Sequence, residues 1–135
     1  MIFVDTGAWF ATVVPSDSDY PVASNWLSQN VEPLITTNYV IDETLTLLRM
    51  RRENQREIAL GNAFFSGALV TIYYVTGADI QQAWQVFCRF SDKDWSFTDC
   101  TSKVVTEKLH VTQAFAFDHH FRQFGSVQVV PQSTN

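Results

Sequence analysis

The sequence has 135 residues, a length typical of one domain. Hydrophobic residues make up 46% of it and charged residues 17%, which excludes an intrinsically disordered chain and indicates a substantial buried core. Its 14 acidic and 9 basic residues give a formal net charge of −5, so it lacks the basic excess that is typical of nucleic-acid-binding proteins.

The two cysteines, Cys88 and Cys100, are too few for a disulfide framework and are typical of free thiols in a reducing compartment. No apolar run approaches the roughly 18 residues that a membrane span requires. The first residues, from Met1 to Asp5, lack the basic region and the long apolar region of a signal peptide. We therefore expect a cytoplasmic protein that does not contact a membrane.

Short apolar segments that favour strands alternate with longer segments that favour helices. Strands are predicted at residues 2–4, 34–36, 69–75, 114–117 and 127–130, and helices at 7–14, 20–29, 38–53, 55–67, 77–91, 97–109 and 119–123. Such alternation predicts βαβ units around a parallel sheet, within one α/β domain over residues 1–135. Ligands of such sheets bind beyond the carboxyl ends of the strands, so residues that follow strands are the first functional candidates.

Aspartates directly follow two of the predicted strands. Asp5 comes after residues 2–4, and Asp118 comes after residues 114–117. If both strands are central and parallel, the two carboxylates lie at the same edge of the sheet. The alternative is that each aspartate only caps the helix that follows it. The sequence leaves both interpretations open.

Two further acids occur in predicted helices. Glu43 falls within the apolar arc of the helix at 38–53, where a carboxylate is costly unless it is paired or binds a metal ion. The alternative is a boundary glutamate whose carboxylate reaches out to solvent. Asp99 lies three residues after Ser96, which is the spacing of a capping box. Thr76 and Asp79 have the same spacing, and we interpret Asp79 as a cap alone.

The order and spacing of these acids resemble the PIN-domain ribonucleases, and in particular the VapC-type toxins of toxin–antitoxin systems. The resemblance covers essentially the whole chain. It rests on residues 2–6, 36–44, 96–99 and 115–121. The resemblance implies a three-layer α/β/α, Rossmann-like domain with a central parallel sheet in the strand order 3-2-1-4-5. It also implies a shared acidic site, formed by Asp5, Glu43, Asp99 and Asp118.

Two further positions match the family pattern less closely. Asp94 corresponds to an acid that occurs in part of the family, and it is a candidate accessory ligand. Thr6 stands where the family frequently has serine, and its hydroxyl is a candidate donor that orients Asp5. The change from serine to threonine keeps the hydroxyl group.

The resemblance implies a metal-dependent endoribonuclease that hydrolyses RNA phosphodiester bonds with Mg2+ or Mn2+. Hard cations of this kind prefer carboxylate oxygens and retain several water molecules. The same resemblance implies a cognate antitoxin that docks on the region 7–29 and blocks the site, and it implies a homodimer.

Basic residues are candidates for contact with RNA phosphates. Arg49, Arg51, Arg52 and Arg56 form the densest patch, but cations at the end of a helix also complement its dipole. Lys93, Lys103 and Arg122 lie near the acidic motifs in the sequence. We expect His119 and His120 at the surface or at a phosphate rather than on a metal ion, because their spacing resembles no histidine metal site.

Two other functions remain open from the sequence. One is a PIN-domain nuclease of RNA maturation that has no toxin role. The other is a non-nuclease α/β phosphoacceptor module in which Asp5 is phosphorylated, although Gly7 stands where aspartate-nucleophile phosphatases have a second aspartate. The chain also lacks a glycine-rich phosphate loop.

The four predicted ligands account for most of the negative net charge. Removing the four predicted ligands from the 14 acidic residues leaves 10 against 9 basic residues, a difference of −1. The acidity is therefore concentrated in the predicted site, and we expect RNA to approach through bound metal ions and local cations.

Overall fold

Within residues 1–132, five parallel strands form one sheet in the order β3-β2-β1-β4-β5, as predicted. The computed structural model describes residues 1–132, and residues 133–135 of the predicted domain lie outside the described residues. The strands are β1 (Ile2–Val4), β2 (Leu34–Thr37), β3 (Thr71–Tyr73), β4 (Gln113–Phe115) and β5 (Gln128–Val130). Because β1 is central, its carboxyl end lies between those of β2 and β4.

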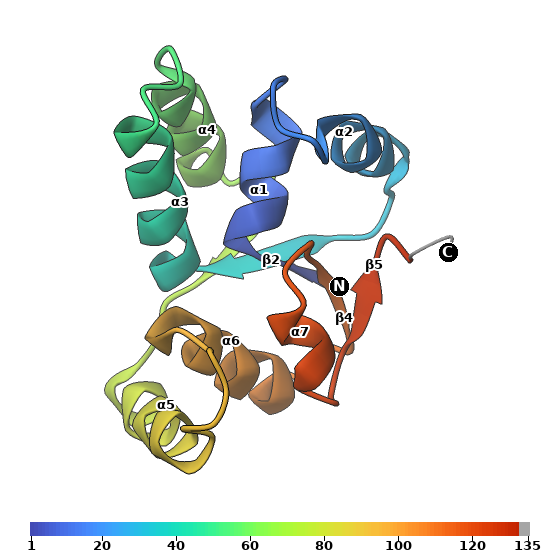
Figure 1. Cartoon of the computed structure of the whole chain (residues 1–135). Coiled ribbons are helices and arrows are strands. Elements are labelled where there is room, and N and C mark those ends of the chain that lie inside the picture. The colour runs from blue at the N-terminus through green and yellow to red at the C-terminus, as the bar shows by residue number, and fades with distance from the viewer. Residues whose placement is uncertain (133–135) are drawn as a thin grey trace.

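Helices cover both faces of this sheet and produce the three layers expected. Helices α1 to α4 lie on one face, and helices α5 to α7 lie on the other (Figure 1). Their bounds are α1 (Thr6–Val13), α2 (Tyr20–Gln29), α3 (Asn38–Met50), α4 (Arg56–Phe65), α5 (Gly77–Arg89), α6 (Phe97–Lys108) and α7 (His120–Gln123). Among the residues described, no helix is both long and apolar enough to cross a membrane.

The core forms where strand residues meet α1. Phe3, Val4 and Phe115 are fully buried, as expected for strands covered on both faces. The indole N–H of Trp9 donates a hydrogen bond to Thr36 Oγ1 at 3.4 Å, and the Thr36 hydroxyl donates to the carbonyl oxygen of Val4 at 2.9 Å. These bonds satisfy polar groups inside the core and fix the beginning of α1 against β2.

Most predicted elements differ from the observed ones by one to three residues at their ends. The strand predicted at 69–75 is only Thr71–Tyr73, and the helix predicted at 38–53 ends at Met50. The strand predicted at 114–117 is Gln113–Phe115 instead. The reason is tertiary, because β4 pairs with β1 only as far as Val4, where the neighbouring chain turns into α1. Asp118 therefore follows its strand after two intervening residues rather than directly.

Candidate metal-binding active site

The four predicted acids meet in one pocket at the carboxyl edge of the sheet. The pocket has a volume of about 390 Å3. Its lining comes from the turn after β1, from α3, from the start of α6 and from the segment between β4 and α7. The lining residues are Asp5, Thr6, Gly7, Glu43, Leu47, Ser96, Asp99, Asp118 and His120. The sheet order brings these residues together, because β1 and β4 are neighbours with the same direction.

Asp5 is the most deeply buried of the acids, at 4% exposure. It occupies the N-cap position of α1, but its side chain makes no capping hydrogen bond, so the capping interpretation is wrong for this residue. Its Oδ1 atom is buried and has no hydrogen-bond partner within residues 1–132. Burial, followed by the charge of Asp99, raises the pKa of Asp5 to about 8. A buried acceptor of this kind suits a bound cation.

Glu43 lies in the second turn of α3 and is half-buried. The buried side of α3 consists of Val40, Ile41, Thr44 and Leu48, so Glu43 stands at the border of that side and reaches the pocket. Desolvation raises the pKa of Glu43, and the charges of Asp99 and Asp118 raise it further. The Thr6 hydroxyl opposes part of this rise, although it does not reach good hydrogen-bond geometry. Thr6 thus lies beside Glu43 as well as next to Asp5.

Asp99 serves as a helix cap and as a pocket residue at once. The Ser96 hydroxyl accepts a hydrogen bond from the Asp99 backbone at 3.0 Å, and Asp99 Oδ2 accepts one from the Ser96 backbone at 3.0 Å. The predicted capping box is therefore present. The same Oδ2 atom lies 2.9 Å from Nδ1 of His120, which comes from α7.

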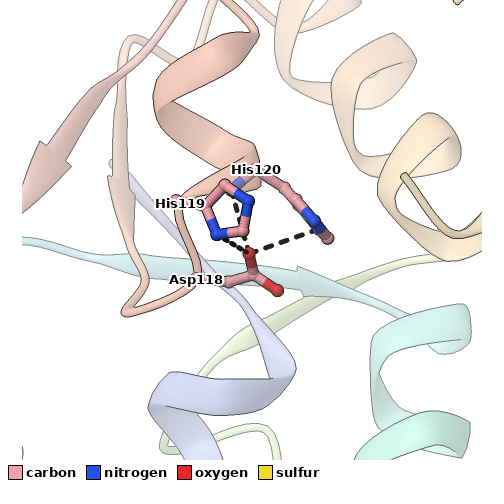
Figure 2. A group of neighbouring side chains, drawn as sticks. All are labelled: Asp118, His119 and His120. Atoms are coloured by element: carbon pink, nitrogen blue, oxygen red, sulfur yellow. Dashed lines mark hydrogen bonds and ion pairs between the residues drawn. The ribbon is translucent and has the colours of Figure 1, made fainter. Parts of the chain in front are cut away.

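Asp118 lies beside two histidines before α7. Its Oδ1 atom accepts a hydrogen bond from the His120 backbone at 2.9 Å and lies 3.2 Å from His120 Nδ1. Figure 2 shows both histidine rings facing this oxygen, while the second oxygen of Asp118 turns away from them. The ligand atoms of Asp118, His119 and His120 all lie within 4.8 Å of one another.

Sequence reasoning missed the part that His120 plays in the pocket. Its side chain is only 14% exposed and lines the pocket, whereas that of His119 is 71% exposed as expected. The signal in the sequence was the position of His120, two residues after Asp118, where a short helix begins. Nothing local in the sequence indicates that Asp99 lies opposite, because the two residues are 21 positions apart.

The structure does not bring the other candidates to the pocket lining. Asp94 is exposed, and it is absent from the residues that line the pocket. Arg49 and Arg56 form ion pairs with Glu57 and Glu53 near the far end of α3. Lys103 pairs with Glu107 one turn further along α6, and Lys93 pairs with Asp92. Arg122, on α7, is exposed and forms no ion pair within the described part of the chain.

The donor set of the pocket fits a hard divalent cation. Four carboxylates converge, and repulsion among them together with burial raises the pKa of two. Mg2+ and Mn2+ favour such oxygen ligands, and a bound cation would relieve both the repulsion and the unpaired Oδ1 of Asp5. Asp5, Glu43, Asp99 and Asp118 are therefore the residues that could hold the ion.

Comparisons with known proteins agree with this fold. The family model of the PIN domain matches residues 2–127. The 23S rRNA-specific endonuclease VapC20 of Mycobacterium tuberculosis is 34% identical over 132 residues, which cover 98% of this chain and 100% of that protein. A VapC ribonuclease of Archaeoglobus fulgidus is 29% identical over 123 residues, which cover 87% of this chain and 77% of that protein.

Solved structures give the same result. The crystal structure of VapC20 from Mycobacterium tuberculosis, described as a sarcin–ricin loop cleaving toxin, superposes with a TM-score of 0.88 at 31% identity. The superposition covers 94% of this chain and 97% of that one. FitAcB from Neisseria gonorrhoeae shares the fold, with a TM-score of 0.63 at 14% identity over 96% of each chain.

Proposed function

This chain belongs to the PIN-domain family, and from that premise we propose that it is a metal-dependent endoribonuclease and the toxin of a toxin–antitoxin pair. The single observation that carries the proposal is the convergence of Asp5, Glu43, Asp99 and Asp118 in one pocket. VapC20 supports the choice of RNA as the substrate, and it makes 23S rRNA the first RNA to test. An enzyme that cleaves such RNA meets its substrate in the cytoplasm.

The four carboxylates hold Mg2+ or Mn2+ in this proposal. When bound there, such an ion would supply an activated water molecule and stabilisation of the charge that develops on the phosphate and the leaving oxygen. The buried Asp5 and Asp99 and the partly exposed Glu43 and Asp118 would together supply the carboxylate oxygens that hold the ion. Thr6 lies beside both Asp5 and Glu43 and is the candidate residue that would orient these two ligands around a bound ion.

The phosphoacceptor alternative has less support than the nuclease. Phosphorylation of Asp5 requires an accessible and ionised carboxylate, but Asp5 is 4% exposed and its pKa is raised to about 8 by burial and by Asp99. A phosphoryl group on Asp5 would also add negative charge among three other acids.

A groove beside α2 supports the proposed antitoxin partner. The groove has a volume of about 760 Å3, and apolar side chains that include Pro21, Val22, Trp26 and Val31 line it. Ile2 and Gln113, at the amino ends of β1 and β4, and Val130, at the carboxyl end of β5, also line it. None of the four acids lines this groove, so an antitoxin that seats there must extend beyond it to block them. We also propose a homodimer, as the resemblance to VapC-type toxins implies.

A cleavage assay on ribosomal and transfer RNA, with and without a chelator, tests the nuclease function. Asp99→Asn should abolish cleavage and leave the fold intact, because asparagine retains an oxygen that can accept the Ser96 hydrogen bond. The matched control is Asp79→Asn, which alters an identical capping box outside the pocket and should leave cleavage in place. Cleavage that resists the chelator, or that persists in Asp99→Asn, would overturn the proposal.

A growth experiment distinguishes a toxin from a nuclease of RNA maturation. A cleavage assay cannot, because both carry out the same reaction. Expression of the wild-type chain should arrest growth, expression of Asp99→Asn should not, and co-expression of a small protein encoded next to it should relieve the arrest. Harmless expression of a chain that cleaves RNA in vitro would favour RNA maturation.

A further inference from the structure

His120 contacts two of the proposed ligands through a single ring nitrogen. Nδ1 lies 2.9 Å from Asp99 Oδ2 and 3.2 Å from Asp118 Oδ1. The backbone of the same histidine donates a hydrogen bond to Asp118 Oδ1 at 2.9 Å. Because the side chain is only 14% exposed, little solvent competes for these contacts. One residue thus joins the start of α6 to the segment before α7.

The atoms around Nδ1 indicate which nitrogen of the His120 ring carries the hydrogen. Both atoms that face Nδ1 are carboxylate oxygens, which accept hydrogen bonds when ionised. Nδ1 is therefore the nitrogen to which we assign the hydrogen, and its N–H donates to Asp99 Oδ2 while Asp118 Oδ1 lies 3.2 Å away. A donor in that place offsets the repulsion between the two negative groups.

The hydrogen bonds use one oxygen of each carboxylate and leave the other. Asp99 Oδ2 accepts from the Ser96 backbone and from His120, and no hydrogen bond to Asp99 Oδ1 forms among residues 1–132. Asp118 Oδ1 accepts from the backbone N–H of His120 and lies 3.2 Å from its ring, and the second oxygen of Asp118 turns away (Figure 2). Each carboxylate therefore retains one oxygen for a cation.

Asp79 shows what a purely structural carboxylate in the same capping box looks like. Its Oδ2 atom accepts from the Thr76 backbone and the Tyr73 hydroxyl, and its Oδ1 atom accepts from Lys108 at 3.0 Å. Both oxygens of Asp79 are thus used, whereas Asp99 has one oxygen left. The difference between the two capping boxes is the partner at the second oxygen.

We propose that His120 is a positioning residue: its Nδ1–H holds Asp99, and its backbone N–H together with the nearby ring fixes Asp118, so that the remaining oxygen of each carboxylate faces the divalent cation. The inference rests on the proposed metal-dependent function and adds a residue to it. His119 does not share the role, because its Nδ1 atom lies 3.6 Å from Asp118 Oδ1, beyond hydrogen-bond distance, and its side chain is 71% exposed.

The test is a titration of the RNA-free chain with Mn2+, in which the spin-resonance signal of the free ion reports binding. His120→Ala should weaken Mn2+ binding by about 10–100-fold. His120→Asn should recover most of that loss, because its amide nitrogen reaches the place of Nδ1. His120→Gln should not, because its amide nitrogen reaches the place of Nε2 instead. His119→Ala is the matched control. It should bind Mn2+ within about twofold of wild type, because the His119 ring makes no hydrogen bond to a proposed ligand.

Several outcomes overturn the inference. Equal Mn2+ affinity of His120→Ala and wild type rules out positioning, as does equal weakness of the folded Asn and Gln variants. A nitrogen directly bonded to Mn2+ in the spin-echo spectrum of wild type, lost in His120→Ala, would make His120 a ligand instead. Failure of wild type to bind Mn2+ would overturn the metal-dependent function itself, and is thereby distinguished from failure of the positioning role alone.

Discussion

The backbone N–H of Asp5 donates a hydrogen bond to the carbonyl oxygen of Phe115 at 3.1 Å, and so ties the first acid of the chain to the end of β4. This bond continues the ladder between β1 and β4 by one residue. It places the Asp5 carboxylate at the edge from which the chain proceeds to Asp118 three residues later. The pocket thus depends on the register of two central strands.

Asp5→Asn should stabilise the metal-free protein at pH 7 by roughly 1–2 kcal/mol, because it removes a buried carboxyl group that burial and Asp99 disfavour as an anion. The same substitution should abolish the stabilisation that Mn2+ gives to wild type. Thermal unfolding with and without Mn2+ measures both effects. If the metal-free variant were less stable than wild type, the buried Asp5 carboxyl would not destabilise the metal-free fold, which would contradict this assignment.

Asp94→Asn should cleave RNA at a rate within about twofold of wild type, since surface substitutions away from a site have small effects. The reason is that Asp94 is exposed and lies outside the lining of the acidic pocket. The comparison variant is Asp118→Asn, which lies in the lining and should lose cleavage. A large loss of cleavage in Asp94→Asn, at unchanged stability, would establish it as an accessory ligand after all.

Arg122→Ala should weaken RNA binding severalfold and lower the slope of log affinity against log salt by about 1, as expected for one lost phosphate contact. Arg122 is exposed on α7, the helix that also carries His120. The measurement uses the Asp99→Asn background, so that bound RNA is not cleaved. Arg49→Ala, whose side chain pairs with Glu57 near the end of α3, is the control and should leave the slope unchanged.

The free energy of unfolding should decrease as the pH falls from about 4 to 2, because Asp79 becomes protonated in this range. Burial alone would raise the pKa of Asp79, but hydrogen bonds from Thr76, Tyr73 and Lys108 lower it to about 2. The folded pKa is thus below the unfolded value of 3.8, so the stabilisation is complete above about pH 4 and is lost as the pH falls through 2. The contribution is about 2 kcal/mol.

Urea unfolding at pH 5 and at pH 2.5 checks this contribution. Asp79→Asn should lose less stability than wild type between the two pH values, because asparagine does not titrate. Lys108→Met should also show a smaller loss, because it removes one of the donors that favour the Asp79 anion. An identical pH dependence in wild type and Asp79→Asn would disprove the assignment.

Much of the fold follows from local patterns in the sequence. Three apolar residues before Asp5 predict a buried strand, and the spacing of Ser96 and Asp99 predicts the capping box that starts α6. Alternation of strands and helices predicts the parallel sheet, whose right-handed crossovers leave few topologies to consider. The errors lie at boundaries such as the end of β4, where pairing with a neighbour, and not local preference, decides the last residue.

The candidate site divides in the same way. The sequence alone determined which acids follow strands or open helices, and the resemblance to PIN-domain ribonucleases selected among them. Only the tertiary structure decided that Asp5 is not a cap, that Asp94 lies outside the pocket, and that His120 faces Asp99. The physical reason is that capping and periodicity act within a turn of the chain. Burial, repulsion between carboxylates and the contact across 21 residues arise only when the sheet brings distant segments together.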